Sequence, residues 1–355
     1  MPPTGATAGP TIAFLFDGSP SDAELVTSPA LTGLELAAHE AGGVEIEPVN
    51  VGLAPDEVTA SLRDLGDDGG VVAAVVAPWT APPGGAIELL AAEGVPVVTL
   101  SWAWGPPREG NGLWLSFVAP RAREAVVVLS GADDASQGAP LCLAGDGDLT
   151  SRSLLATSEQ LGRAAGEPEI RTAGIAEADP AATAEAVAAR IENAGCSVLV
   201  WIGNGDVAAS VLASVPDPPS VVGTSRMKTD AGLGLASPGT AVSTVCACVD
   251  VSLSTESTSM RFVHDLQAES GAPPGTFAVE AYDAVRLLIG LIEGAGATRD
   301  LVEKELDDIT QFRGVVQSYV FEPDGSRAPE SLRTGTWRAV GSRWLPGTAA
   351  FGASA

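Results

Sequence analysis

Long apolar runs are absent from this sequence. No stretch of 18 consecutive apolar residues occurs, so no segment has the character of a membrane-spanning helix. The opening residues, MPPTGATAGPTIAFLF, also lack the basic flank and apolar core of a secretory signal. We therefore expect no membrane insertion of this chain. If the protein acts outside the cytoplasm, its signal segment is missing here, and the Pro/Gly/Thr-rich residues 1–10 are interpreted as a disordered N-terminal tether.

Basic residues are scarce. The chain has 19 Lys and Arg residues against 45 Asp and Glu residues, a formal net charge of -26. A surface of this sign is repelled by nucleic acids and by anionic membranes, because both are bound through cationic side chains. We expect no nucleic-acid partner.

Cysteine is also rare. The four cysteines contain no Cys-x-x-Cys pair and match neither a zinc pattern nor a disulfide-rich scaffold. Cys142 and Cys196 each lie in a strand-like apolar run, and Cys246 and Cys248 are spaced to face one side of a strand. We expect all four to be unreactive buried thiols, the usual state of free cysteine. A bridge between Cys142 and Cys196 stays open as an alternative.

Sequence motifs of catalysis and cofactor binding are missing as well. Gly203-x-Gly205 follows a predicted strand but lacks the third glycine of a dinucleotide fingerprint. The stretch GTSRM at 223–227 is not a nucleophile elbow. We expect neither an enzyme activity nor a cofactor.

Metal-binding patterns are equally weak. His39 and His264 lie on predicted helices without a second histidine or cysteine at ligand spacing, so we interpret them as solvated or satisfied helix residues. Asp146-x-Asp148 is too short and isolated for a calcium loop. The sequence therefore predicts no metal site.

What the sequence does contain is a regular alternation of short β-branched runs with Ala/Leu-rich helical segments. With 355 residues, 45% of them hydrophobic, the chain is long enough for two cores. The alternation is typical of parallel sheets wrapped by helices, so the predicted fold class is α/β with two doubly wound lobes. The first series of strands and helices comprises 11–16, 29–42, 44–51, 55–66, 71–77, 84–94, 95–100 and 113–119.

A second series restarts the same order of elements. It comprises 121–131, 140–145, 151–165, 168–173, 180–194, 196–203, 206–214 and 220–224. A long strand over 241–251 follows, then helices over 255–269, 277–294 and 298–309. A hairpin over 314–327, with Asp324-Gly325 at its turn, and a terminal strand over 334–340 complete the prediction.

Open α/β sheets bind ligands in the crevice outside the carboxyl ends of their strands, and this rule selects six loops. In lobe 1 they are Asp17-Gly18-Ser19, Trp79-Thr80 and Ser101-Trp102-Ala103-Trp104. In lobe 2 they are Asp146-Gly147-Asp148, Asn204-Gly205-Asp206 and Thr224-Ser225-Arg226. We expect a small-molecule ligand to contact these loops.

Several stretches resemble the type I periplasmic binding proteins, specifically the branched-chain amino acid (Leu/Ile/Val) binding proteins that serve ABC importers. They are TGLELAAHEAGGVEIEPV, GVPVVTLS at 94–101, and FAVEAYDAVRLLIGLIEGAG followed by FRGVVQSYVFEPDGSR. The last segment is similar to the family's F-x-G-x-x-G-x-x-x-F-x-x-x-G-x-R pattern, with Gln317 in place of a glycine. The resemblance covers about residues 11 to 340.

The resemblance implies two lobes joined by a three-segment hinge that closes around a ligand. Lobe 1 would comprise 11–119 plus 251–323, and lobe 2 would comprise 120–250 plus 324–350. It also implies an extracytoplasmic solute-binding protein, periplasmic or tethered to the cell surface, that captures an amino acid or related small polar ligand and has an ABC permease as its partner. Within FAVEAYDAVRLLIGLIEGAG, we interpret Tyr282 and Asp283 as packing residues that fix nearby backbone, rather than ligand contacts.

By resemblance, Thr80 and Ser101 correspond to residues that bind the ligand's α-carboxylate through hydroxyls and backbone N–H groups. The alternative is that both merely cap the helices that follow their strands. The family's ammonium-binding carboxylate is missing from the matching stretch, GTSRMKTD. Arg226 would instead favour an acidic or amide-bearing ligand, and Asp146, Asp148 or Asp206 could take the ammonium role.

Three tryptophans complete the predicted site, because Trp79, Trp102 and Trp104 all fall in crevice loops. They would pack on an apolar, aromatic or cationic ligand, or else simply fill the loops. The predicted ligand-binding residues are Asp17, Trp79, Thr80, Ser101, Trp102, Asp146, Asn204, Thr224, Ser225 and Arg226. Two other functions remain as alternatives: a ligand sensor of the same fold that controls a regulatory partner, and an enzyme acting on a cleft-bound substrate.

Overall fold

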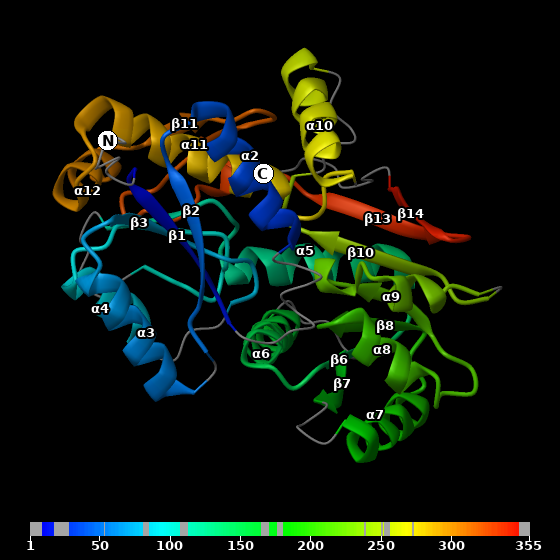
Figure 1. Cartoon of the computed structure of the whole chain (residues 1–355). Coiled ribbons are helices and arrows are strands. Elements are labelled where there is room, and N and C mark those ends of the chain that lie inside the picture. The colour runs from blue at the N-terminus through cyan, green and yellow to red at the C-terminus, as the bar shows by residue number, and fades with distance from the viewer. Residues whose placement is uncertain are drawn as a thin grey trace. The chain divides into compact units, whose positions relative to one another are not determined.

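The computed structural model divides the chain into two compact units. Unit 1 comprises Met1–Ala119 and Ser254–Leu332, and unit 2 comprises Pro120–Leu253 and Arg333–Ala355. Each unit is built on its own sheet (Figure 1). The described residues are 9–17, 28–52, 54–80, 85–106, 113–164, 170–175, 180–237, 239–249, 251, 256–271 and 273–347. The predicted tether over 1–10 therefore lies almost entirely outside them.

The sheet of unit 1 has five parallel strands in the order β2-β1-β3-β4-β5. Every residue of β3 is buried, as expected for a parallel strand that is covered on both faces. The edge strand β2 is mostly exposed and carries a proline and two glutamates, features that discourage pairing with another chain. The strands are β1 (Thr11–Phe16), β2 (Glu45–Asn50), β3 (Val71–Val76), β4 (Val97–Thr99) and β5 (Trp114–Ser116).

Helices cover the sheet of unit 1, and two of them meet at a glycine. α11 packs against α2, where a Cβ atom at Gly33 would lie 2.4 Å from the carbonyl oxygen of Ala278. Only glycine permits so close a backbone approach. The helices are α2 (Ser28–Ala41), α3 (Pro55–Asp67), α4 (Ala86–Ala92), α10 (Ser257–Ser270), α11 (Ala278–Ala295) and α12 (Arg299–Asp307). His39 and His264 are exposed on α2 and α10, as predicted.

Tyr282 and Asp283 pack α11 and fix nearby backbone, as the family resemblance predicted. The Tyr282 hydroxyl donates to Glu40 Oε2 on α2 at 2.5 Å. Asp283 accepts from the backbone N–H of Val315 at 2.8 Å and from the Tyr319 hydroxyl at 3.0 Å. α11 is thereby fixed both to α2 and to the hairpin of β11 (Gln311–Arg313) and β12 (Ser318–Val320).

The sheet of unit 2 has seven strands in the order β14-β13-β10-β9-β8-β6-β7. Five are parallel, and the last two in sequence, β13 and β14, run antiparallel at one edge. The strands are β6 (Leu141–Gly145), β7 (Ile170–Ile175), β8 (Val198–Ile202), β9 (Ser220–Gly223), β10 (Val242–Cys246), β13 (Gly335–Val340) and β14 (Arg343–Pro346). The helices are α5 (Arg121–Ser136), α6 (Leu149–Ala164), α7 (Pro180–Ala194), α8 (Gly205–Leu212) and α9 (Asp230–Gly234).

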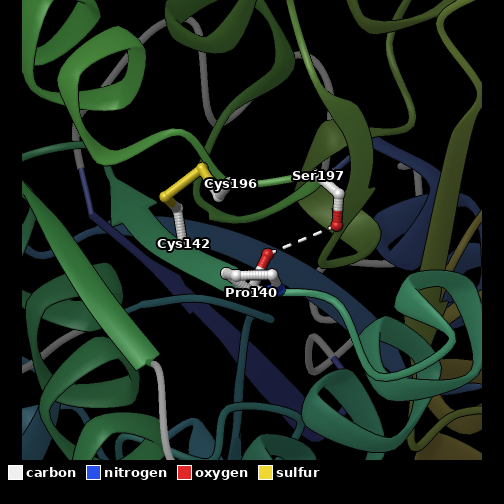
Figure 2. Close-up of a disulfide and its surroundings, with 4 residues drawn as sticks. All are labelled: Pro140, Cys142, Cys196 and Ser197. Carbon is white, nitrogen blue, oxygen red and sulfur yellow. Dashed lines mark hydrogen bonds between the residues drawn. A yellow bond between two sulfur atoms is a disulfide. The ribbon is translucent and has the colours of Figure 1, made fainter.

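The expectation of four free thiols is wrong. Cys142 on β6 is bonded to Cys196, with 5.7 Å between their Cα atoms, and Ser197 adds a 3.4 Å hydrogen bond to the Pro140 carbonyl (Figure 2). Cys196 lies two residues before β8 rather than within a strand. Cys246 ends β10 and Cys248 lies beyond the strand, and these two cysteines pair with each other. No described cysteine is free.

Two strand predictions were also wrong. The long strand expected over 241–251 ends at Cys246, because the next N–H, that of Ala247, donates to the Glu124 carboxylate instead of continuing the sheet. The expected terminal strand is followed by a further one, β14. Its sequence, RWLP, is a weak strand pattern, but Trp344 packs on the core of unit 2 and donates to the Thr229 carbonyl at 3.2 Å.

The C-terminal segment of unit 1 also differs from its prediction. Residues 324–332, assigned to lobe 2 by resemblance, belong to unit 1, because Gly325 accepts from Ser116 N at 2.9 Å and Arg327 donates to the Phe117 carbonyl at 2.8 Å. Residues 251–253, assigned to lobe 1, belong to unit 2. The single hairpin expected over 314–327 is two successive turns, one joining β11 to β12 and one at Asp324-Gly325.

Candidate functional site

Both units have the same strand order around their first strand. In each, the first strand lies between the second and the third, so the winding direction of the sheet reverses at β1/β3 in unit 1 and at β6/β8 in unit 2. Open α/β sheets bind ligands at such a reversal, outside the carboxyl ends of the strands. The six predicted loops follow the carboxyl ends of β1, β3, β4, β6, β8 and β9. Each unit therefore has its candidate site at one end of its own sheet.

In unit 1, the loop after β4 is bonded to the loop after β3. Ser101 is fully buried, and its hydroxyl donates to the Thr80 carbonyl at 2.8 Å. The same hydroxyl accepts from Ala103 N at 3.3 Å. The alternative reading of both residues as helix caps is wrong, because α4 is capped by Gly85 and the described residues between Ser101 and β5 contain no helix. These bonds hold both loops in one conformation.

Trp79 has an unusual backbone conformation. Its φ of 64° lies in the left-handed region, which bulky side chains rarely adopt and which tends to persist at functional sites. Its ring meets that of Trp102 edge to face, with centroids 5.6 Å apart. Both side chains are buried, and the indole N–H of Trp102 has no hydrogen-bond acceptor among the described residues. A ligand acceptor would satisfy that N–H.

The remaining predicted loop residues of unit 1 differ in their surroundings. Trp104 is 2% exposed and packs in the core with Val97 and Trp114, which favours the alternative that it fills the loop, and its contact with a ligand stays a prediction. Asp17 follows β1 and is half-buried. Gly18 and Ser19 lie outside the described residues.

In unit 2, one carboxyl group joins the two strands at the sheet reversal. Asp146 follows β6, and its Oδ2 accepts from the backbone N–H of Asn204, which follows β8, at 2.6 Å. Gly203 makes this possible, because a Cβ atom there would lie 2.2 Å from the same oxygen, and its φ of 144° disfavours other residues. The second oxygen of Asp146, Oδ1, is buried and receives no hydrogen bond from any described residue.

A second carboxylate, Asp148, is fully engaged within unit 2. Its two oxygens accept from the backbone N–H and the hydroxyl of Ser151, at 2.8 and 2.9 Å, and so cap the start of α6. It also forms a salt bridge with Arg226, whose side chain is buried. The positive charge of Arg226, expected to attract an acidic ligand, is therefore already balanced by an internal carboxylate.

The two carboxyl groups differ in pKa. Burial, followed by the hydrogen bond to Asp148, raises the pKa of Asp146 to about 8. Burial would also raise the pKa of Asp148, but the hydrogen bond from Asp146 and the charge of Arg226 lower it to about 2. These surroundings favour the neutral form of Asp146 and the ionised form of Asp148.

Two buried hydroxyl groups also lie at the carboxyl end of the unit 2 sheet. Thr224 and Ser225 follow β9, both are buried, and neither hydroxyl has a hydrogen-bond partner in the described part of the chain. Buried polar atoms nearly always have partners in folded proteins, so a group of three such atoms at one end of a sheet indicates a ligand position. Asn204 is engaged, because its side chain caps α8 at Asp206 N. Asp206 is exposed on that helix.

Comparison with known proteins identifies the family. A family model described as periplasmic binding protein matches residues 10–342. The chain belongs to the periplasmic binding protein family. Solved structures share the type I fold of this group over nearly the whole chain. No match was found among curated protein sequences.

Two of the similar structures hold a branched-chain amino acid. The substrate-binding protein LivJ from Streptococcus pneumoniae, in complex with isoleucine, is 15% identical with a TM-score of 0.71, covering 96% of this chain and 100% of its own. An ABC transporter substrate-binding protein from Desulfitobacterium hafniense, in complex with Leu, is 16% identical with a TM-score of 0.70, covering 95% and 99%. The structural likeness to these two proteins establishes the fold of this periplasmic binding protein.

A third similar structure holds a ligand of another kind. The solute-binding protein of an ABC transporter from R. palustris, in complex with benzoate, is 15% identical with a TM-score of 0.73, covering 95% of each chain. The fold thus accommodates both amino acids and an aromatic acid. The ligand class of a family member follows from its own loops.

Sequence reasoning missed the pairing of Asp148 with Arg226. A local signal existed only for the capping role of Asp148, because its position three residues before Ser151 at the start of a helical pattern predicts an N-cap. In the described residues, no cluster of three His, Cys, Asp or Glu side chains has the arrangement of a metal site. Nor does a described helix combine the length and apolarity needed to cross a bilayer.

Proposed function

We propose that this periplasmic binding protein is an extracytoplasmic, non-enzymatic solute-binding protein that closes its two lobes over a small polar ligand and delivers it to an ABC permease. Family membership supports the solute-binding role. The partner permease and the location, periplasmic or tethered to the cell surface, are inferred from the importer proteins that share the fold.

The observation that carries the proposal is the presence of unsatisfied polar atoms at the sheet reversal of each unit. They are the indole N–H of Trp102 in unit 1, and Asp146 Oδ1 and the hydroxyls of Thr224 and Ser225 in unit 2. A bound ligand supplies the missing partners, which lowers the cost of burying these groups. Asp17, Trp79, Thr80, Ser101, Asn204 and Arg226 are proposed to shape the same loops or to contact the ligand directly.

An amino acid is the proposed ligand class. Thr80 and Ser101 lie in the loops that would receive its carboxylate, although the Ser101 hydroxyl already donates to the Thr80 carbonyl. Backbone N–H groups in these two loops are the remaining donors for an anion. The ABC importer role is preferred to sensing because two of the similar structures are named as substrate-binding proteins of transporters.

A thermal-shift screen tests the proposal. The purified chain is heated with L-leucine, L-isoleucine, L-phenylalanine, benzoate, short amides and polyamines, and hits are confirmed by calorimetry. A ligand at about 100 times its dissociation constant adds roughly 2.7 kcal/mol to stability, which is readily detected. Turnover of a bound compound would favour an enzyme, and absence of binding across the whole screen would contradict the proposal.

Variants locate the site once a ligand is found. Trp102→Ala and Ser225→Ala should weaken binding about tenfold or more, because each removes one of the unsatisfied polar groups from the proposed site. Ser210→Ala, on the exposed face of α8, is the matched control and should bind normally. Equal affinity of all three variants would show that the ligand binds elsewhere.

A further inference from the structure

The C-terminal hairpin of unit 2, formed by β13 and β14, differs in charge from the rest of the chain. Asp and Glu account for 45 of the 355 residues, yet none occurs after Glu330. The segment 331–355 instead contains three arginines, Arg333, Arg338 and Arg343. A local reversal of charge on an acidic protein indicates a surface that attracts molecules which the rest of the protein repels.

One face of this hairpin packs inward. Trp337 is 5% exposed, and Ala339 and Trp344 pack against the core of unit 2. The same face holds the loop after β9, because the Trp344 indole N–H donates to the Thr229 carbonyl at 3.2 Å. In addition, the Lys228 ammonium lies 4.1 Å from the centroid of the Trp337 ring. The hairpin therefore supports a loop of the candidate ligand site.

The opposite face of the hairpin combines positive charge with apolar surface. Side chains alternate along a strand, so four residues share this outer face: Arg338 and Val340 of β13, and Arg343 and Leu345 of β14. In the strand register Arg338 lies opposite Leu345, and Val340 lies opposite Arg343. Each cross-strand pair thus joins an arginine to an aliphatic side chain. Val340 is 54% exposed and Leu345 is 43% exposed.

Helix α5 covers the corresponding face of the inner strands but leaves the outer face of the hairpin exposed. It packs against β8, β9 and β10, and a Cβ atom at Gly131 would lie 3.1 Å from the Val245 side chain. Val245 is paired with Thr336, which points to the same side as Arg338 two residues later. Neither arginine of the outer face forms an ion pair or hydrogen bond with a described residue.

We propose that the outer face of the β13–β14 hairpin is a docking surface for a segment of a partner protein in which carboxylates alternate with aliphatic side chains. The carboxylates pair with the two guanidinium groups, which bind carboxylates in bidentate fashion. The aliphatic side chains of the segment cover Val340 and Leu345, and their burial removes apolar surface from water. The proposal goes beyond the solute-binding function and holds whichever small ligand occupies the candidate site.

Charge favours a protein segment over a membrane or a second copy of this chain. An anionic bilayer extends well beyond the hairpin and would also meet the acidic remainder of the surface, which repels it. A second copy would bring its own formal charge of -26. A short segment contacts the hairpin alone. It docks on the face of the hairpin rather than along its edge, because β14 is short and contains Pro346, features that discourage strand addition.

Fluorescence anisotropy with a defined peptide tests the docking surface. The probe is a short labelled peptide in which Glu and Leu alternate, and the comparison peptide alternates Glu and Ser. We expect the first peptide to bind and its affinity to fall as the salt concentration is raised, because exposed charge pairs are screened by salt. The second peptide should bind less tightly, since it lacks the apolar side chains. Absence of binding by the Glu and Leu peptide would overturn the proposal.

Charge-reversal variants locate the bound peptide. Arg338→Glu combined with Arg343→Glu should weaken binding about tenfold or more, because like charges then face each other across the contact. Arg152→Glu combined with Arg190→Glu is the matched control, since these exposed arginines of α6 and α7 change the net charge by the same amount. The control should bind as the wild type does. Equal weakening in both double variants would show a general charge effect and would overturn the hairpin surface.

The apolar half of the surface has its own variant. Val340→Ser combined with Leu345→Ser keeps both arginines and should weaken binding of the Glu and Leu peptide about threefold or more. Binding of the Glu and Ser peptide should be the same in this variant as in the wild type. Unchanged affinity for both peptides would overturn the apolar part of the contact. Circular dichroism of each variant verifies that it is folded.

Two further measurements distinguish the other occupants. Wild type and the Arg338→Glu, Arg343→Glu variant are centrifuged with vesicles of phosphatidylcholine and phosphatidylglycerol, and sedimentation velocity of each protein alone reports its oligomeric state. We expect neither vesicle binding nor dimers. Vesicle binding that the variant loses would assign the outer face to a lipid surface, and a dimer that the variant loses would assign it to a second copy. Either result would overturn the docking proposal and leave the solute-binding function standing.

Discussion

Unit 1 and unit 2 share a topology but not a chemistry. Each sheet reverses its winding beside its first strand, and in each that strand is followed by Asp-Gly, at Asp17-Gly18 and at Asp146-Gly147. The third strand then differs, because unit 1 places Trp79 after it and unit 2 places Gly203 and Asn204 there. One unit thus offers aromatic rings and the other offers ionisable groups. A shared strand order fixes where a ligand site lies, and loop residues decide what binds.

The means of stabilisation differ in the same way. All four cysteines belong to unit 2, whereas unit 1 has none and relies on buried polar contacts between α11, α2 and the β11–β12 hairpin. The following variants should therefore act on one unit and spare the other. Amide hydrogen exchange followed along the chain separates the two responses.

The largest effect is expected from the Cys142–Cys196 bridge. It joins residues separated by 54 positions, and closing a loop of that length in the unfolded chain contributes about 4 kcal/mol. Replacing both cysteines with alanine should destabilise unit 2 by roughly that amount and leave exchange in unit 1 unchanged. Loss of protection in both units would show that they unfold together.

Asp283→Ala should have the next largest effect, now in unit 1. It leaves the Val315 N–H and the buried Tyr319 hydroxyl without their acceptor, which costs about 3 kcal/mol. Denaturant unfolding monitored by exchange in β11 and β12 measures the loss. Ligand affinity, by contrast, should not change, and a drop in affinity with unaltered stability would contradict the scaffold role.

Glu124→Gln probes the pH dependence of unit 2. Burial raises the pKa of Glu124 to about 7, against a smaller lowering by the Ala247 N–H. Because the folded unit binds this proton more tightly than the unfolded chain does, the associated stability is present below about pH 4.5 and is lost as the pH rises through 7. Between about pH 5 and pH 8, wild-type unit 2 should lose about 2 kcal/mol more stability than the variant does. Thermal melts of the wild type and Glu124→Gln across that range measure this difference in stability loss. Equal losses in the two proteins would contradict the prediction.

The smallest effect is expected from Tyr282→Phe. The variant keeps the ring packed against Phe262 and removes only the hydrogen bond to Glu40, so unit 1 should lose about 1 kcal/mol. Glu40→Gln is a companion variant that keeps an acceptor and should cost less. An unchanged melting temperature in Tyr282→Phe would mean that the bond adds nothing to the packing.

The element order was predictable because strand and helix periods are clear along this chain. Helix α7 matches its prediction over 180–194, and β3 ends within one residue of its own. The failures occur where tertiary contacts override local pattern. β10 ends because the Ala247 N–H donates to the buried Glu124 carboxylate. β14 forms because Trp344 packs against the core of unit 2.

The positions of the site residues were predictable, but their chemical states were not. Topology placed Asp146, Asn204 and Ser101 at the carboxyl ends of strands. Whether Arg226 is available to a ligand depends on its contact with Asp148, 78 residues away in the sequence, and no local pattern encodes that contact. The burial of Trp104 in the core of unit 1 also depends on tertiary contacts, so no local pattern predicts it.

Amide hydrogen exchange with and without the best ligand from the thermal screen shows whether the ligand binds at the sheet reversals. We expect protection in the loops after β3 and β4 of unit 1 and after β6, β8 and β9 of unit 2, with little change at the amino ends of the same strands. Protection confined to another surface, such as the apolar hollow between α8 and α9 that Leu212 and Leu235 line, would contradict it.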